Sequence, residues 1–413
     1  MVSSSKVFLL LCAGIFLGAC EEQSSPEATT LTDEPVPIVP AEVTPDLQLA
    51  QTSALGDPLP QLDPTEILNF TAGQIAFAEV EEVDDGLGPV FNEASCASCH
   101  TAPVGGTTGR LETRFGRTAN GMFDPLTTVG GSLLQDHAIG AVADGAVFFA
   151  EQVPSTANVV AGRMTTPLFG LGLVDAVPDA ELIGLALLER ALTRTPGTPS
   201  MVQDIATGET RVGRFGWKAQ VATLHTFSGD AYLNEMGVTS PDFPNETCPQ
   251  GDCAALVHNP VPGLNDEGDD VEAFTDFMTL LAPPPRGPGN TVTGASLFLI
   301  SGCAGCHTPR LATGRSSTPA LDRKVFEPFS DFLLHDMGTL GDGIVQGAAN
   351  GRQMRTAPLW GLHTRPAFLH DGRATTVQAA ILAHDGQGRS ARDRFVGLTA
   401  EKRQALLAYL NSL

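Results

Sequence analysis

Basic residues are scarce in this chain, and in its first hundred residues they are almost absent. Between Cys20 and His100 the sequence has 16 acidic residues and no Lys or Arg, and the whole chain has a formal net charge of −23. Such a polyanion repels phosphates, which excludes nucleic acid as a natural partner. After the first twenty residues the chain also lacks a long apolar run, so no membrane-spanning helix is predicted there.

One short apolar run does stand at the start of the chain. Lys6 precedes apolar residues 7–16, and the small residues of segment 17–20 (LGAC) follow. This order is typical of a secretory signal, here residues 1–19. It resembles a bacterial lipoprotein signal, which implies lipid attachment at Cys20 on the periplasmic side of a membrane, with Glu21 favouring the outer membrane. A plain signal peptide is the alternative.

The length of 413 residues predicts two or three domains with ample core. Residues 20–62 are acidic and rich in Pro, Thr and Ser, with few aromatic residues. This composition is typical of disorder, so we expect an acidic tether between the lipid and the folded part.

The eight cysteines can almost all be assigned. Cys12 leaves with the signal, Cys20 takes the lipid, and four others belong to two Cys-x-x-Cys-His segments. Cys248 and Cys253 remain, and in an oxidising compartment they are expected to form a local disulfide. A redox-active dithiol is the less favoured alternative, because the Cys-x-x-Cys spacing is absent.

The two Cys-x-x-Cys-His segments, residues 96–100 and 303–307, indicate covalent attachment of haem. Each supplies two thiols on one face of a helical turn and a histidine that can bind the iron from the same side. A zinc site built from both cysteine pairs is the alternative, and the histidine that directly follows each pair disfavours it. The predicted attachment residues and iron ligands are Cys96, Cys99, His100, Cys303, Cys306 and His307.

The two haem segments belong to an internal repeat. Residues 91–100 and 298–307 share the pattern FxxxxCAxCH, and residues 165–171 and 356–362 share TxPL(F/W)GL. Helical patterns are clear at residues 179–189 and 399–413, whereas strand signals are sparse. The sequence therefore predicts a mainly α fold of two cytochrome c-like haem domains with long irregular loops and an insert between them. We expect residues 63–285 to form the N-terminal haem domain with the insert, and residues 286–413 to form the C-terminal one.

Several further motifs carry a resemblance to a known family. They are residues 86–96 (GLGPVFNEASC), 213–219 (GRFGWKA), 234–240 (NEMGVTS), 333–338 (LLHDMG), 355–361 (RTAPLWG) and 368–376 (FLHDGRATT). With the haem segments, they make the chain similar to the dihaem oxidoreductases that are described as peroxidases or thiol oxidoreductases. That family is distantly similar to the bacterial dihaem cytochrome c peroxidases and to MauG. No cysteine is spare for thiol exchange, so we favour the peroxidase-type activity.

The resemblance implies a methionine as the second protein ligand of the second haem. Met354 is the candidate, and Met337 and His335 compete with it. The first haem is expected to keep an open face where peroxide binds. His137 and Glu151, together with Gln135, lie in the stretch expected to cross that face, so His137 and Glu151 are the predicted proton-moving catalytic residues. Trp217 and Trp360 are candidates for an aromatic relay between the haems, although either could belong to the core.

The function expected from this resemblance is the two-electron reduction of a peroxide at the His100 haem. Electrons would arrive through the His307 haem from a small exported donor such as a cytochrome c. The alternatives are a non-catalytic electron-transfer cytochrome and a MauG-like or oxygenase-type enzyme that oxidises an organic substrate. Calcium is a further cofactor that the sequence leaves open.

Overall fold

The computed structural model describes residues 48–50, 53–193, 195–289 and 292–413. The predicted signal, Cys20 and most of the predicted tether lie outside these residues. Leu59, which the sequence placed in the tether, is buried, and its N–H donates to the Leu280 carbonyl at 2.7 Å. The folded part therefore begins before residue 63. No helix in the described ranges is long and apolar enough to cross a membrane.

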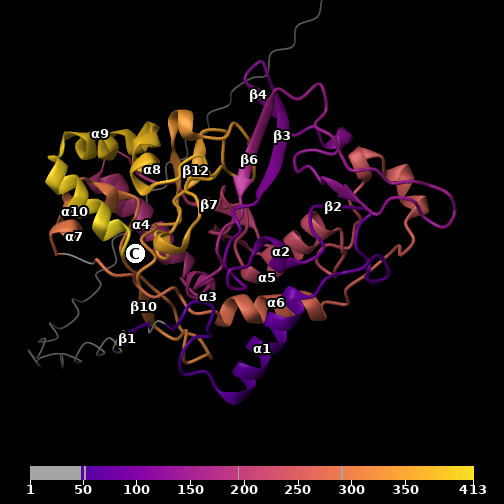
Figure 1. Cartoon of the computed structure of the whole chain (residues 1–413), viewed down its shortest axis with the longest axis horizontal. Coiled ribbons are helices and arrows are strands. Elements are labelled where there is room, and N and C mark those ends of the chain that lie inside the picture. The colour runs from indigo at the N-terminus through magenta and orange to yellow at the C-terminus, as the bar shows by residue number, and fades with distance from the viewer. Residues whose placement is uncertain (1–47, 51–52, 194, 290–291) are drawn as a thin grey trace, which may run out of the picture. The chain divides into compact units, whose positions relative to one another are not determined.

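Helices form most of the regular structure (Figure 1). The described α-helices are α1 (Pro64–Ala78), α2 (Cys96–Cys99), α3 (Leu171–Asp175), α4 (Asp179–Leu192), α5 (Leu224–Ala231), α6 (Asp269–Leu280), α7 (Val292–Ile300), α8 (Val377–Ala383), α9 (Arg389–Gly397) and α10 (Ala400–Leu410). The helix predicted at residues 179–189 is confirmed by α4. The helix predicted from residue 399 is α10, with Thr399 as its N-cap, and it ends at Leu410.

Short strands are more numerous than the sequence indicated. They are β1 (Gln48–Leu49), β2 (Val90–Phe91), β3 (Leu111–Ala119), β4 (Met122–Asp124), β5 (His137–Ala138), β6 (Val159–Met164), β7 (Ser200–Gln203), β8 (Thr210–Gly213), β9 (Leu311–Ala312), β10 (Lys324–Phe326), β11 (Leu334–Asp336) and β12 (Gln353–Arg355). The strand orders are β4-β3-β6, β1-β10-β9, and the pairs β2-β5, β7-β8 and β11-β12. All pairings are antiparallel except that of β1 with β10. The mainly α prediction is therefore confirmed only in part.

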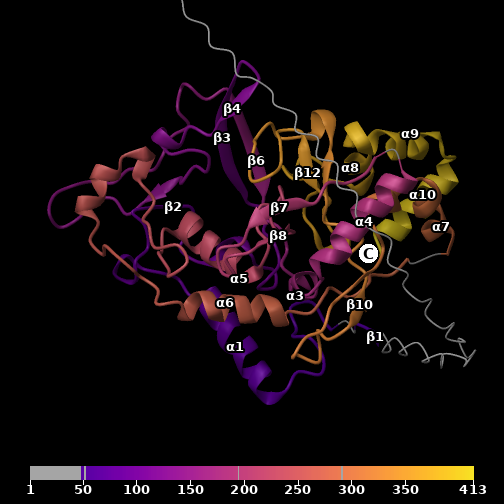
Figure 2. The ribbon, with the colours of Figure 1, turned by 180° about the vertical axis from the view of Figure 1, so that it is seen from behind.

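Asp46–Leu413 form one compact unit with two main hydrophobic cores. The smaller core joins α7, α8, α9 and α10 through residues such as Phe298, Phe395 and Leu406. Both views show α8, α9 and α10 gathered on one side, and α1, α5 and α6 below β6 (Figures 1 and 2). The predicted domain boundary at residues 285 and 286 stays a prediction.

The larger core contains the helix pair that supports the first haem segment. Gly73 of α1 allows close packing on α6, because a Cβ atom there would lie 2.2 Å from the Ala273 carbonyl oxygen. The ring of Phe77 then packs against those of Phe274 and Phe277 at centroid distances of 6.0 and 5.1 Å. This aromatic cluster places Phe77 beside α2.

Candidate functional site

The first Cys-x-x-Cys-His segment forms one helical turn at a cavity of about 170 Å³. The backbone N–H of His100 donates to the Cys96 carbonyl at 3.0 Å, so both thiols and the imidazole share the cavity wall. Burial lowers the pKa of His100 to about 4, which keeps its ring neutral and able to bind a metal at pH 7. Both thiols are free, and burial raises the pKa of Cys96 to about 12 and that of Cys99 to about 11.

The second segment has the same donors at a larger cavity, of about 640 Å³. That volume is within the range of roughly 300–1,000 Å³ that is usual for cofactor sites. The His307 Nδ1 lies 3.0 Å from the Phe329 carbonyl oxygen, which can only accept, so Nδ1 donates and Nε2 is left for a metal. Burial lowers the pKa of His307 to about 4. Two free thiols and one neutral buried imidazole at each segment fit a covalently bound haem.

The two cysteine pairs do not combine into a zinc site. Cys96 and Cys99 line the first cavity, whereas Cys303 and Cys306 line the second. Within the described ranges, the group of three or more potential metal ligands that converges contains a single thiol and is formed by Cys306, Asp331 and His335. The haem interpretation of the two segments therefore fits the structure better than zinc does.

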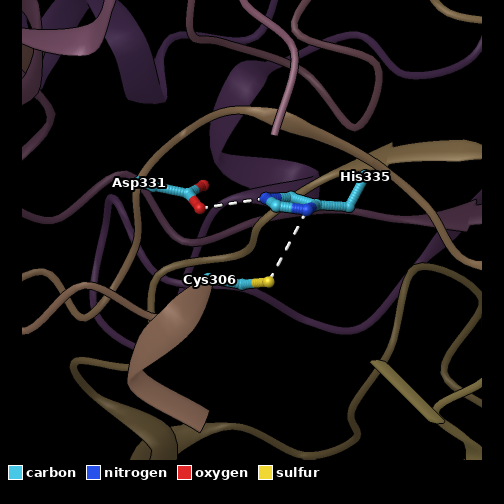
Figure 3. Close-up of side chains that lie close together, drawn as sticks. All are labelled: Cys306, Asp331 and His335. Carbon is cyan, nitrogen blue, oxygen red and sulfur yellow. Dashed lines mark hydrogen bonds and ion pairs between the residues drawn. The ribbon is translucent and has the colours of Figure 1, made fainter. Parts of the chain in front are cut away.

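His335 lies between Asp331 and Cys306 (Figure 3). Its Nε2 is 3.0 Å from the Asp331 carboxylate and its Nδ1 is 3.6 Å from the Cys306 sulfur. Burial opposes protonation of this ring, but the Asp331 carboxylate raises the pKa of His335 well above its ordinary value. Both ring nitrogens of His335 are thus engaged in this structure.

The first cavity is lined by partly buried acids and by arginines. The Arg114 guanidinium donates to both oxygens of Glu112, at 3.0 and 3.2 Å, and overcomes the effect of burial to hold the pKa of Glu112 low. Burial and the neighbouring Glu112 charge raise the pKa of Glu235, which accepts a hydrogen bond from Asn92 at 2.7 Å. Burial also raises the pKa of Asp230 to about 6. One ionised and one protonated glutamic acid therefore share this cavity.

The predicted catalytic residues lie elsewhere. His137 is half exposed, and its Nδ1 is 2.6 Å from the Asp136 carboxylate. Glu151 is buried, but its carboxylate accepts hydrogen bonds from the backbone N–H groups of Gln135 and Gln250, at 3.0 and 2.6 Å. Neither His137, Gln135 nor Glu151 lines the first cavity. The structure does not bring these residues to the site.

Sequence reasoning missed Glu112 and Glu235 as site residues. Glu235 lies in the quoted motif 234–240, and that membership was the available signal. No sequence signal pointed to Glu112, because the pairing of β3 with β6 and the contact with Arg114 bring it to the cavity.

The second cavity collects the three ligand candidates that the sequence named. His335 and Met354 face each other as a cross-strand pair of β11 and β12, so their side chains share one face of the sheet, and both line the cavity. Met337 lines it too, as do His370 and His384, which the sequence analysis did not consider. His384 directly follows α8, shortly after the quoted motif 368–376.

Two arginines at the second cavity, Arg355 and Arg365, form no ion pair with an acidic residue in the described part of the chain. Arg355 donates to the Gly216 carbonyl at 2.7 Å and Arg365 to the Pro358 carbonyl at 2.7 Å. Burial lowers the pKa of each to about 10, and Arg365 adds to the shift of Arg355, so the two cations are close together and still charged at pH 7. The Arg365 Nε is buried without a hydrogen-bond partner among the described residues. The pair fits an anionic ligand such as the carboxylates of a haem.

One tryptophan lies between the cavities. Met164, Thr165, Thr166 and Trp217 line both of them, and the Trp217 Nε1 donates to the Met164 carbonyl at 2.8 Å. Trp360 lines neither cavity and belongs to the larger core. Of the two relay candidates, only Trp217 is placed between the haem segments.

A buried ion network supports this shared wall. The Asp342 carboxylate accepts from Arg163 Nε at 2.8 Å and is 2.7 Å from Lys218 Nζ, and all three side chains are almost fully buried. Arg163 precedes Met164 and Lys218 follows Trp217 in the sequence. The network therefore ties both wall segments to the loop that contains Asp342.

The remaining cysteine prediction is confirmed. Cys248 and Cys253 are joined by a disulfide, and the other cysteines in the described part of the chain are the four of the haem segments. Outside the two Cys-x-x-Cys-His segments, no described cysteine is a free thiol.

Comparison with known proteins identifies a family for this chain. Residues 152–413 match the family described as "Di-haem oxidoreductase, putative peroxidase". That range covers well over half of the chain and begins after the first Cys-x-x-Cys-His segment. No curated protein matched the chain.

Three solved structures resemble the chain at 15% sequence identity. Hydrazine synthase of Kuenenia stuttgartiensis has a TM-score of 0.36, with 89% of this chain and 99% of that chain covered. A MauG-like protein associated with microbial copper homeostasis has a TM-score of 0.37, with 89% and 93% covered. A diheme peroxidase of Burkholderia thailandensis has a TM-score of 0.37, with 88% and 89% covered.

Proposed function

Because the chain belongs to the di-haem oxidoreductase family, we propose that it is an exported c-type cytochrome that reduces peroxide at the first of its two haems. Haem attachment is assigned to the two Cys-x-x-Cys-His segments, with His100 and His307 as iron ligands. A bound haem would supply one-electron redox chemistry at each cavity. The observation that carries the assignment is the contrast between the cavities, since the glutamic acid pair Glu112 and Glu235 lines only the first.

Peroxide reduction to water consumes two electrons and two protons, so the reaction site needs a proton donor. Glu235, whose pKa is raised, can donate a proton to a leaving oxygen at neutral pH, and Glu112 is held ionised by Arg114. Asn92 fixes the orientation of the Glu235 carboxyl group. These groups take the role that the sequence analysis gave to His137 and Glu151.

Electrons are proposed to enter at the second cavity and to reach the first across the wall that contains Trp217. The donor is proposed to be a small exported protein such as a cytochrome c. Residues 351–413 contain nine basic and four acidic residues. Between Cys20 and His100 there are 16 acidic residues and no Lys or Arg. This asymmetry would orient a charged donor protein on the molecule.

Haem content tests the cofactor assignment. Cys96→Ala and Cys303→Ala should each remove one covalent linkage, seen as a loss of haem mass from the intact protein. Iron should be present at two atoms per chain and zinc should be absent. A wild-type chain with fewer than two covalent haems would contradict the assignment.

Peroxide turnover with a reduced cytochrome donor tests the reaction. Glu235→Gln should lower the rate by about 10²–10⁴-fold, the usual contribution of a proton-transfer group. Glu246→Gln is the matched control, because burial raises the pKa of Glu246 to about 7 but the residue lines neither cavity. Loss of activity in Glu151→Gln instead would return the catalytic role to the sequence-based candidate. An inert wild-type protein that still exchanges electrons would favour the electron-transfer alternative.

Localisation remains a separate proposal, because Cys20 lies outside the described residues. Mature protein should partition with membranes through a lipid on Cys20. Cys20→Ser should release it into the periplasm, and unchanged membrane association of that variant would contradict lipid anchoring.

A further inference from the structure

His384 has the placement of a metal ligand. It follows α8 directly, is partly buried, and lines the second cavity together with His307. Its Nδ1 lies 2.8 Å from the Ala380 carbonyl oxygen, so Nδ1 donates and Nε2 is the nitrogen left for a ligand role. His307 has the same arrangement, with its Nδ1 held by the Phe329 carbonyl.

The two rings are also at the spacing that one shared metal requires. Their centroids are 6.4 Å apart, with a tilt of 56° between the ring planes. Two imidazoles that bind one metal ion from opposite sides have nitrogens about 4 Å apart, since each metal–nitrogen bond is about 2 Å. Adding the distance from each nitrogen to its ring centre gives a centroid separation slightly above about 6 Å.

The geometry points to His384, and not Met354, as the second protein ligand of the iron at the His307 site. This inference rests on the proposed haem attachment at Cys303 and Cys306. Met354 shares a sheet face with His335, whereas the ring of His384 lies 6.4 Å from that of His307. His335 Nε2 donates to the Asp331 carboxylate at 3.0 Å, so this nitrogen is not free for a metal.

The competing histidine is also less suitable. His370 packs the edge of its ring against Trp217 at a centroid distance of 6.2 Å and faces the wall between the cavities. Among the described residues, His100 is the single histidine that lines the first cavity. The two sites therefore differ in their protein ligands. Two imidazoles would bind the iron at the His307 site, whereas the His100 site offers one imidazole and a cavity lined by carboxyl groups.

Near-infrared magnetic circular dichroism of the oxidised full-length holoprotein gives a variant-free test. The charge-transfer band of a low-spin haem differs between bis-histidine and histidine–methionine ligation. We expect the bis-histidine band from one haem per chain. A histidine–methionine band at the second haem would overturn the inference.

Substitutions give a second test by electron paramagnetic resonance. His384→Gly should convert the second haem from low spin to high spin, and added imidazole should restore the low-spin signal. Met354→Leu is the matched control and should leave that signal in place. Loss of the low-spin signal in Met354→Leu, with retention in His384→Gly, would overturn the inference. Absence of haem mass on the peptide that contains Cys303 and Cys306 would instead contradict the proposed function.

Discussion

Replacement of Asp342 by Asn should strongly destabilise the protein. The substitution removes the carboxylate that contacts both Arg163 and Lys218, and their side chains are 2% and 0% exposed. Removing one partner of a buried ion pair costs about 3–5 kcal/mol, because the charge left behind cannot regain its hydration. We therefore expect the free energy of unfolding to fall by about 3–5 kcal/mol.

Urea unfolding at pH 7 measures this loss, with haem absorbance and tryptophan fluorescence as two probes. Asp336→Asn is the control, because Asp336 pairs with Arg352 at the surface, where both side chains are well exposed. An exposed pair contributes at most about 1 kcal/mol. If Asp342→Asn and Asp336→Asn lowered the urea midpoint equally, the buried ion network would contribute no more to stability than the surface ion pair does.

A third variant separates charge from packing. Lys218→Met removes one buried cation and leaves the Arg163–Asp342 pair intact, so its cost should be clearly smaller than that of Asp342→Asn. Lys218 also donates to the Gln353 carbonyl at 2.6 Å, and that hydrogen bond would be lost. A larger loss in Lys218→Met than in Asp342→Asn would refute the reasoning.

Three further perturbations follow from the same structure. Burial raises the pKa of Asp175 to about 6, so the folded protein keeps a proton that the unfolded chain has already lost. The free energy of unfolding should therefore fall as the pH rises from about 4 to 6. Asp175→Asn should flatten this part of the stability–pH curve measured by urea unfolding. Arg355→Gln should lower the reduction potential of the second haem by roughly 60 mV, because a nearby cation favours the reduced iron. That shift is a tenfold change in the equilibrium constant for one-electron reduction. In the same redox titration, Arg352→Gln should leave the potential near that of the wild type. Trp217→Phe should slow electron transfer between the haems in stopped-flow measurements, whereas Trp360→Phe should affect stability alone, and equal rates in both variants would remove Trp217 from the path.

The sequence alone determined the features that depend on short spacing. Two thiols and a histidine within five residues are brought together by one helical turn, so both haem segments could be recognised before any fold was known. The disulfide between Cys248 and Cys253 is equally local. Helices α4 and α10 were predictable because an apolar pattern and an N-cap such as Thr399 act over a few residues.

Only the tertiary structure decided which side chains complete the cavities. His137 and Glu151 were chosen for their place along the chain, but a backbone can pass near a site while its side chains turn to other partners, here Asp136 and Gln135. Glu112 reaches the first cavity through the pairing of β3 with β6.

The second cavity shows the same division. His384 is 77 residues from His307, and no local pattern couples two residues so far apart. Their ring centroids lie 6.4 Å apart because α8 and Cys303 pack in the same hydrophobic core. The carbonyl groups of Ala380 and Phe329 orient the two imidazoles. The sequence thus indicated where the two Cys-x-x-Cys-His segments lie, while long-range packing decided which side chains line the cavity beside each segment.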